Sequence, residues 1–210
     1  MRKIIVNILS IILSFVLFIP ITVFADEIAS YETGKSVKYR WNVKSGSIYT
    51  ISVYNMLPSS YGAYRYVVTG TNNIKNQSPS NIGASYLGAG SYSPTSNVDV
   101  SRPDQETWNR LGLGGLALAT TAPASNGNFY YNYASMPNSG TVYVNYALVM
   151  FHPSTNNMQQ SEAISTVMHE FCHVFGMGHT ANQNSILSAS GVGSTRLGSF
   201  DISEFRRMYP

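Results

Sequence analysis

The chain contains little cysteine, little histidine and little charge. Cys172 is the only cysteine among 210 residues, so no internal disulfide can form and a disulfide framework is excluded. Charged residues make up 11% of the chain, and neither a basic patch nor a lysine-rich stripe is present. We therefore expect neither nucleic-acid binding nor a basic membrane-binding surface. The 15 tyrosines instead favour strands and a polar, weakly charged surface.

The first 25 residues have the pattern of a secretory signal peptide. The chain begins with the basic residues Arg2 and Lys3 after Met1, residues 4–19 are almost uninterrupted apolar sequence, and Ala25 ends a segment with small residues at the cleavage positions. We expect cleavage after Ala25, secretion of the remaining chain, and no stable membrane association. The alternative is an uncleaved signal anchor, because the apolar run approaches membrane-spanning length. Pro20 and Ala25 favour cleavage.

The remaining residues, 26–210, have the size of one domain. About 185 residues suffice for a single core and are too few for two large domains. Without Arg2 and Lys3 the chain carries 11 basic and 10 acidic side chains, a net charge of +1. Residues 26–40 are polar and lack periodicity, which predicts a short flexible or pro-like N-terminus. We expect one folded domain over 41–210, present as a monomer.

Three of the four histidines lie in one eleven-residue segment, His-Glu-Phe-Cys-His-Val-Phe-Gly-Met-Gly-His, from His169 to His179. Residues four apart in a helix project about 40° apart, so His169 and His173 can both reach one zinc ion. Gly176 is the natural end of that helix, because glycine adopts positive φ without steric cost. The chain then turns back and delivers His179 as the third ligand. The spacing predicts one catalytic zinc ion.

Glu170 lies on the flank of the ligand face, where it suits proton transfer and not coordination. Zinc lowers the pKa of bound water towards about 7, and Glu170 is expected to take the proton as this zinc-bound water attacks a carbonyl group. The alternative is a core helix whose histidines are merely hydrogen-bonded. That alternative does not explain why only one histidine lies outside the segment. The segment therefore favours a hydrolytic enzyme.

Periodicity predicts several strands and helices around this segment. Alternating polar and apolar residues, together with short apolar runs between turn residues, predict the strands, which we place at 47–54, 82–87, 116–119 and 141–146. Helical spacing predicts three helices, namely 58–70, a helix from an N-cap at Ser161 to Gly176, and Ile202 to Met208 with Asp201 as its cap. Strands and helices alternate in the first half, whereas two helices dominate the second.

The sequence resembles the metzincin clan of zinc endopeptidases, and within it the bacterial matrixin-like branch. Every fixed position of the clan signature is met from His169 to His179, and Thr180 is close to the serine usual in matrixins. The resemblance extends more weakly over 46–210. It implies an α+β fold, in which a twisted mixed sheet lies over the active-site helix and a small C-terminal subdomain ends in a helix. It also implies that Leu116 and Ala117, in the edge strand, bind a peptide substrate.

The sequence departs from the family pattern at several positions. Leu187 stands where metzincins carry the methionine of a turn beneath the zinc, and Leu and Met have similar volumes. Leu118 replaces a histidine that serves a second, structural zinc in vertebrate matrixins, and aspartates are too sparse for calcium loops. We therefore expect one zinc ion and no structural metal. Ala189 and Gly191 replace the residues of the usual specificity wall, so the resemblance implies no cleavage preference.

The resemblance implies a secreted zinc endopeptidase that acts on a protein or peptide, with a cell-wall peptide as an alternative substrate. A different class is a zinc-holding but inactive adhesion or binding module of the same fold. The presence of Glu170 argues against that module, because an inactive relative is expected to lose its general base first. No cysteine precedes the site, so we expect no cysteine-thiolate latency.

Overall fold

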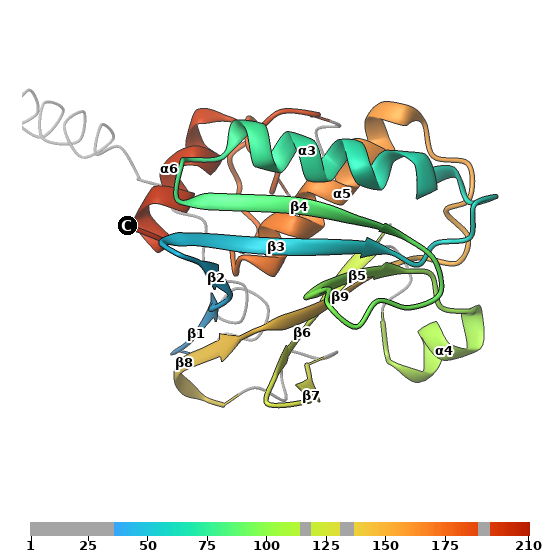
Figure 1. Cartoon of the computed structure of the whole chain (residues 1–210), viewed down its shortest axis with the longest axis horizontal. Coiled ribbons are helices and arrows are strands. Elements are labelled where there is room, and N and C mark those ends of the chain that lie inside the picture. Colours follow the sequence, from blue (N-terminus) through green and yellow to red (C-terminus); the bar gives the residue numbers. More distant parts are fainter. Residues whose placement is uncertain (1–35, 114–118, 131–136, 189–193) are drawn as a thin grey trace, which may run out of the picture.

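The computed structural model describes residues 36–113, 119–130, 137–188 and 194–210, and it belongs to the α+β class. Within these residues a seven-stranded mixed sheet runs in the order β2-β3-β5-β9-β6-β7, with β4 paired to β3 (Figure 1). Its strands are β2 (Lys44–Ser45), β3 (Ile48–Asn55), β4 (Ile82–Ala89), β5 (Val98–Ser101), β6 (Ala119–Ser125), β7 (Asn128–Phe129) and β9 (Tyr146–Phe151).

Strands β3, β4, β5 and β9 are parallel, whereas β6 runs antiparallel to β9. In β3, side chains alternate between the two faces, and Ile51 and Val53 are fully buried. Strand β6 contains Pro123, which has no amide hydrogen to donate. The Pro123 carbonyl oxygen accepts a hydrogen bond from the Tyr130 amide at 2.9 Å, on the side away from β9. A proline is tolerated at this position because the backbone nitrogen of residue 123 faces away from β9 and is not required to donate a hydrogen bond to that strand.

A second, two-stranded sheet pairs the start of the described chain with its middle. Strand β1 (Ser36–Trp41) lies parallel to β8 (Ser139–Val144). Tyr39 and Trp41 of β1 are 0% and 1% exposed. Residues 36–40, which we expected to be flexible, therefore form a strand whose aromatic side chains enter the core.

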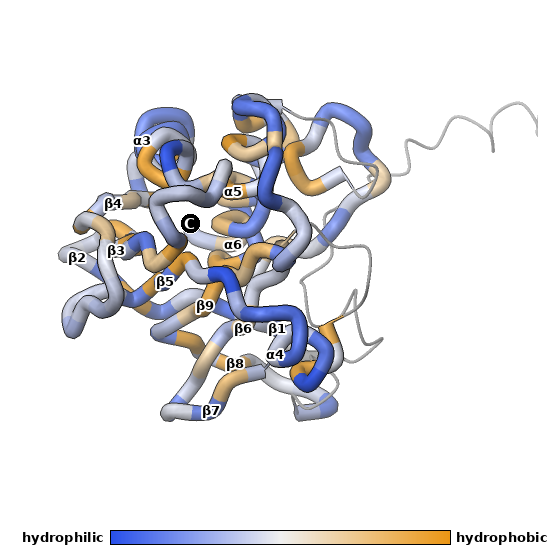
Figure 2. Tube along the Cα trace, turned by 90° about the vertical axis from the view of Figure 1, so that its right-hand side faces the viewer, coloured by the Kyte–Doolittle hydropathy of each residue, from blue (hydrophilic) through white to orange (hydrophobic). Residues whose placement is uncertain are grey.

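Two long helices cover one face of the large sheet (Figure 1). They are α3 (Val67–Gln77), which follows the 3₁₀ helix η1 (Gly62–Tyr66), and α5 (Gln160–Val174). The short helix α4 (Gln105–Arg110) packs through Trp108 in a small separate cluster with Ala122 and Met150. Hydrophobic segments gather along the central strands and the facing helices, with hydrophilic segments around them (Figure 2).

The predicted helix near residues 58–70 begins later and ends later than expected. Its first turns are the 3₁₀ helix η1, and α3 then continues past Gly70 to Gln77. Gly70 is needed for packing and not for termination, because a Cβ at this position would overlap the side chain of Val167. The absence of a side chain lets α3 approach α5 closely at this point.

The ends of the other two predicted helices also differ in detail. The cap of helix α5 is Gln159, two residues before the expected Ser161, and Gln159 and Glu162 form a capping box. Helix α6 (Ser199–Met208) is capped at Gly198, and Asp201 lies in its first turn. The Asp201 carboxylate accepts the Gly198 amide at 2.7 Å, so it supports the helix start from inside the helix.

Some of the predicted strands are present, and several other predictions concern residues outside the described part of the chain. The strands at 47–54 and 82–87 are present as β3 and β4, and that at 141–146 is present as β8, which ends at Val144. The unpredicted elements are β1, β2, β5, most of β6, β7, β9 and α4. The signal peptide and Leu116, Ala117, Leu118, Ala189 and Gly191 lie outside the described residues. No helix in the described part of the chain has the length and apolar character required to cross a membrane.

Candidate metal centre

Helix α5 carries the first two histidines and the glutamate of the candidate site. His169 and His173 are one turn apart on the helix, and their ring centroids are 4.5 Å apart. His173 and Glu170 are 5% and 4% exposed, whereas His169 and His179 are half-buried. The cluster is therefore buried at His173 and Glu170 and only partly exposed at His169 and His179.

Gly176 ends the helical path and starts the return to His179. Its φ of +91° is in the left-handed region, where glycine is favoured. A Cβ at Gly176 would also overlap the carbonyl oxygen of Tyr39 in β1. The Met177 amide donates to the Cys172 carbonyl oxygen at 3.1 Å, which closes the turn. The expected helix end at Gly176 is confirmed.

The three imidazoles converge, as their spacing predicted. Their ligand atoms lie within 4.8 Å of one another. The Nε2 atom of His169 is 2.9 Å from that of His173 and 3.2 Å from that of His179. These residues could hold a metal ion.

The backbone contacts of two rings indicate which ring nitrogen carries the proton. The Nδ1 atom of His169 is 2.8 Å from the Ile186 carbonyl oxygen, and that of His173 is 2.7 Å from the Met177 carbonyl oxygen. A carbonyl oxygen only accepts, so Nδ1 must carry the proton in each neutral ring. Their Nε2 lone pairs then face each other without a hydrogen between them. A cation held among the rings would turn this repulsion into coordination, and three imidazoles are a ligand set that zinc would suit.

The electrostatics of the histidines favour the ligand form. Burial, and to a smaller extent the neighbouring His179, lowers the pKa of His169 to about 4. The hydrogen bond to Ile186 acts in the opposite direction and raises this pKa. Burial also holds the pKa of His173 well below its usual value, and the two other histidines add to this effect. Neutral imidazole is the form that binds a metal, so both rings are ready to coordinate at neutral pH.

Glu170 is buried beside the cluster and contacts strand β6. Its Oε2 atom accepts a hydrogen bond from the Thr121 hydroxyl at 2.7 Å. Burial raises the pKa of Glu170 to about 7, whereas the Thr121 hydrogen bond and His179 lower it. A carboxylate with this pKa can accept and return a proton near neutral pH.

The segment after His179 returns to the site and is anchored by Asp201. The Asp201 carboxylate accepts hydrogen bonds from the Ser185 hydroxyl and from the Ile186 amide, the latter at 3.1 Å. Leu187 is fully buried, and its carbonyl oxygen accepts the Thr180 amide at 3.0 Å. The segment that contains Leu187 thus lies beside the third histidine, and its Ile186 carbonyl orients the first.

Two tyrosines from distant parts of the chain hold the end of α5. The Tyr39 hydroxyl donates to the Val174 carbonyl oxygen at 2.7 Å, and the Tyr209 hydroxyl donates to that of Phe175. The Trp41 amide donates to the Tyr209 hydroxyl at 3.0 Å. These contacts satisfy carbonyl groups that a helix C-terminus leaves without partners.

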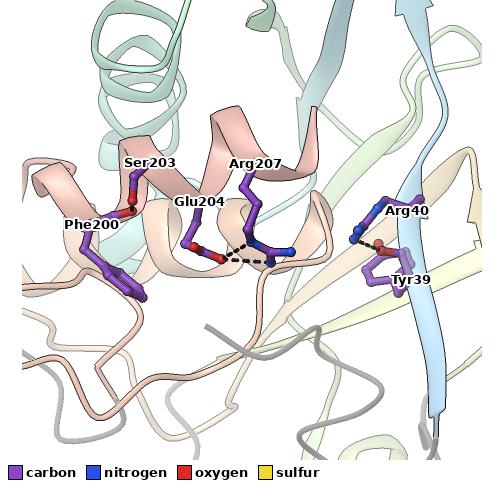
Figure 3. A network of polar contacts seen from close by, with 6 residues as sticks. All are labelled: Tyr39, Arg40, Phe200, Ser203, Glu204 and Arg207. Atoms are coloured by element: carbon purple, nitrogen blue, oxygen red, sulfur yellow. Dashed lines mark hydrogen bonds and ion pairs between the residues drawn. The ribbon is translucent and has the colours of Figure 1, made fainter. Parts of the chain in front are cut away.

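Polar contacts also stabilise the two elements that supply these tyrosines (Figure 3). On α6 the Arg207 guanidinium pairs with Glu204 at 2.9 Å, and on β1 the Arg40 guanidinium donates to the Tyr39 carbonyl oxygen at 3.3 Å. Glu204 is 2% exposed, so its pairing with Arg207 is needed to offset burial of the charge. These contacts lie on β1, which contains Tyr39, and on α6, which Tyr209 directly follows.

The structure brings together the three histidines that could hold a metal ion and places Glu170 on the same helix as two of them; the motif predicted these four residues. Sequence reasoning missed Thr121, Tyr39 and Tyr209, and it assigned Asp201 only to a helix cap. No local pattern marks these residues, because each reaches the site through a contact between distant parts of the chain. Leu116 and Ala117 lie outside the described residues, and their role stays a prediction.

Comparisons with known proteins add little to this picture. No protein-family description and no curated protein matches the sequence. Among solved structures, a structure of myroilysin is 18% identical in sequence to this chain, with a TM-score of 0.34. The match covers 74% of this chain and 57% of the myroilysin chain. A crystal structure of myroilysin is 17% identical to this chain, with a TM-score of 0.40. The match covers 89% of this chain and 95% of that myroilysin chain. The fold and the site define an α+β protein with a three-histidine cluster that could hold a metal ion.

Proposed function

We propose that the chain is a secreted zinc-dependent endopeptidase of the metzincin clan, matrixin-like branch. The observation that carries the proposal is the convergence of His169, His173 and His179 beside a buried glutamate. Two Nδ1–H groups held by backbone carbonyls direct the unprotonated Nε2 atoms of His169 and His173 inwards. A hydrogen-bonded core cluster would not need two unprotonated nitrogens at 2.9 Å.

When bound, a zinc ion supplies a Lewis acid that acidifies water and polarises a carbonyl group. Glu170 accepts the proton of the attacking water and passes it to the leaving amine. Burial raises the pKa of Glu170, which favours its taking up a proton in this exchange. His173 and His169 hold their rings in one orientation through Met177 and Ile186.

The substrate in this proposal is an extended peptide that adds to the edge of the sheet next to β6. Among the described residues, β6 pairs with β9 along 119–124, whereas on its other side β7 pairs with Ala124 and Ser125 and the Tyr130 amide bonds to Pro123. Main-chain hydrogen bonds of such an added strand would supply affinity without selecting side chains. Leu116 and Ala117, directly before β6, are the residues we assign to this binding.

The test uses the chain that begins at Asp26, with bound metal measured beside digestion of a random peptide library. We expect one zinc per chain and peptide cleavage. Glu170→Ala should keep its zinc and lose at least about 10²–10⁴-fold in rate. Glu106→Ala, an exposed glutamate on α4, is the matched control and should cleave normally.

Each other outcome has a defined meaning. Zinc binding without cleavage of any peptide would favour the inactive binding module. Cleavage confined to cell-wall peptides would keep the enzyme and change its substrate. Normal turnover in Glu170→Ala would overturn the mechanism. N-terminal sequencing of the exported protein tests secretion, and a first residue other than Asp26 would contradict the expected cleavage site.

A further inference from the structure

Strand β6 makes a specific contact with Glu170 through one side chain. The Thr121 hydroxyl is 2.7 Å from Glu170 Oε2 and 3.2 Å from the Glu170 carbonyl oxygen. Thr121 and Glu170 are each 4% exposed, so water does not compete strongly for this contact. The hydroxyl has a single proton, so it donates to the nearer acceptor, Oε2, and the carbonyl oxygen is at most a second, weaker acceptor. The hydroxyl therefore restrains the side chain of Glu170.

The sheet register explains why Thr121 can do this and its neighbour cannot. Thr121 lies opposite Val149 of β9, a fully buried residue, whereas Thr120 lies opposite Met150. Met150 belongs to the separate cluster around Trp108. Successive strand residues face opposite sides of a sheet, so Thr121 faces α5 and Thr120 faces the Trp108 side.

The contact distinguishes the two carboxylate oxygens of Glu170. Oε2 accepts the Thr121 hydroxyl, and no residue in the described ranges hydrogen-bonds to Oε1. A donor fixed on one oxygen limits rotation of the carboxylate and leaves the other oxygen available for a proton. A base restrained in this way loses less orientational freedom when the transition state forms.

We propose that Thr121 is a positioning residue for hydrolysis: its hydroxyl holds Oε2 of Glu170 so that Oε1 is the oxygen that receives the proton. This inference rests on the proposed endopeptidase function. It also connects the general base to the strand beside which the substrate would add. A peptide that pairs with this edge would therefore bind next to the residue that orients the base.

The test compares Thr121→Val, Thr121→Ser and Thr120→Val in the chain from Asp26. Valine has the shape of threonine without the hydroxyl, serine keeps the hydroxyl, and Thr120→Val makes the same change on the other face. The readouts are kcat and KM on one quenched fluorescent peptide from the library, zinc content, and the visible absorption spectrum of the cobalt-substituted protein. The spectrum reports the geometry of the three histidines independently of activity.

We expect Thr121→Val to lower kcat by about 10–100-fold, as for other groups that orient a metal-site residue, with KM, zinc content and the cobalt spectrum unchanged. Thr121→Ser should recover most of the loss, and Thr120→Val should lie within about twofold of the parent chain, as expected for a change away from the site. If Thr121→Val is as active as Thr120→Val, the positioning role of Thr121 is overturned, whereas the endopeptidase function is not. Loss of zinc or an altered cobalt spectrum in Thr121→Val would show a structural role and also overturn it. An inactive parent chain with zinc bound would overturn the endopeptidase function, and the role of Thr121 with it.

Discussion

The metal centre has two sides that are built in different ways. On one side, His169 and His173 are one turn apart on α5, and local helix geometry alone brings their rings together. On the other side, His179 follows a turn at Gly176 whose position depends on residues far away in the chain. Tyr39 and Tyr209 hold the helix end, and Asp201 anchors the returning segment. The helix side needs only its own sequence, whereas the return side needs most of the fold.

The largest effect should come from removing the ligand on the return side. His179→Ala should lose most of its zinc, because a catalytic site has three protein ligands and needs all of them. The measurement is elemental analysis after dialysis against a weak chelator. His152→Ala, which removes the histidine outside the cluster, is the control and should keep one zinc per chain. Full zinc occupancy in His179→Ala would mean that the helix side suffices alone.

The next effect should come from the turn that separates the two sides. Gly176→Ala places a side chain at a φ of +91° and against the Tyr39 carbonyl oxygen. Gly112 has a φ of +69° with nothing within 4 Å, so Gly112→Ala measures the backbone cost alone, about 1–2 kcal/mol. Gly176→Ala should lower the free energy of unfolding by about 1–3 kcal/mol more, the usual cost of overpacking. Denaturant unfolding of both variants gives the difference, and equal losses would exclude a tight contact with β1.

The same contrast explains what the sequence could predict. His169, Glu170, His173 and His179 follow from spacing within eleven residues, and the helix end follows from the freedom of glycine at Gly176. Strand β9 was missed because it is buried and nearly continuously apolar, so it lacks the alternation of β3.

Contacts between residues that are distant in sequence could not be predicted from the sequence. Thr121 contacts Glu170 across 49 positions of sequence, and Tyr39 contacts Val174 across 135. A tyrosine or threonine in a strand has no local signature that distinguishes such a contact from ordinary packing. Gly70 was misread for the same reason, because its partner Val167 lies on another helix.

A smaller effect should follow from removing one hydroxyl at the end of α5. Tyr39→Phe leaves the Val174 carbonyl oxygen buried without its donor, which should cost about 1–2 kcal/mol. Tyr143→Phe is the matched control, because Tyr143 on β8 is 60% exposed and its loss of a hydroxyl should be within about 0.5 kcal/mol. Thermal unfolding and zinc affinity by chelator competition check both variants. An unchanged zinc affinity in Tyr39→Phe would show that the hydrogen bond at the helix end stabilises the fold without affecting metal binding.

The smallest effect should come from Leu187→Met, which restores the residue that the metzincin resemblance expects. Leu187 is fully buried within the returning segment; its carbonyl oxygen accepts the Thr180 amide, and its own amide donates to the Ser185 hydroxyl. Leu and Met have similar volumes, so the change should alter the free energy of unfolding by less than about 1.5 kcal/mol. The Leu187 backbone contacts, and not its side-chain type, hold the segment that places the Ile186 carbonyl on His169. Zinc affinity and kcat should therefore stay within about twofold of the parent chain, the range of a volume-conserving change. A tenfold gain in either would show that the sulfur atom, and not only a hydrophobic residue of this size, is needed on the return side.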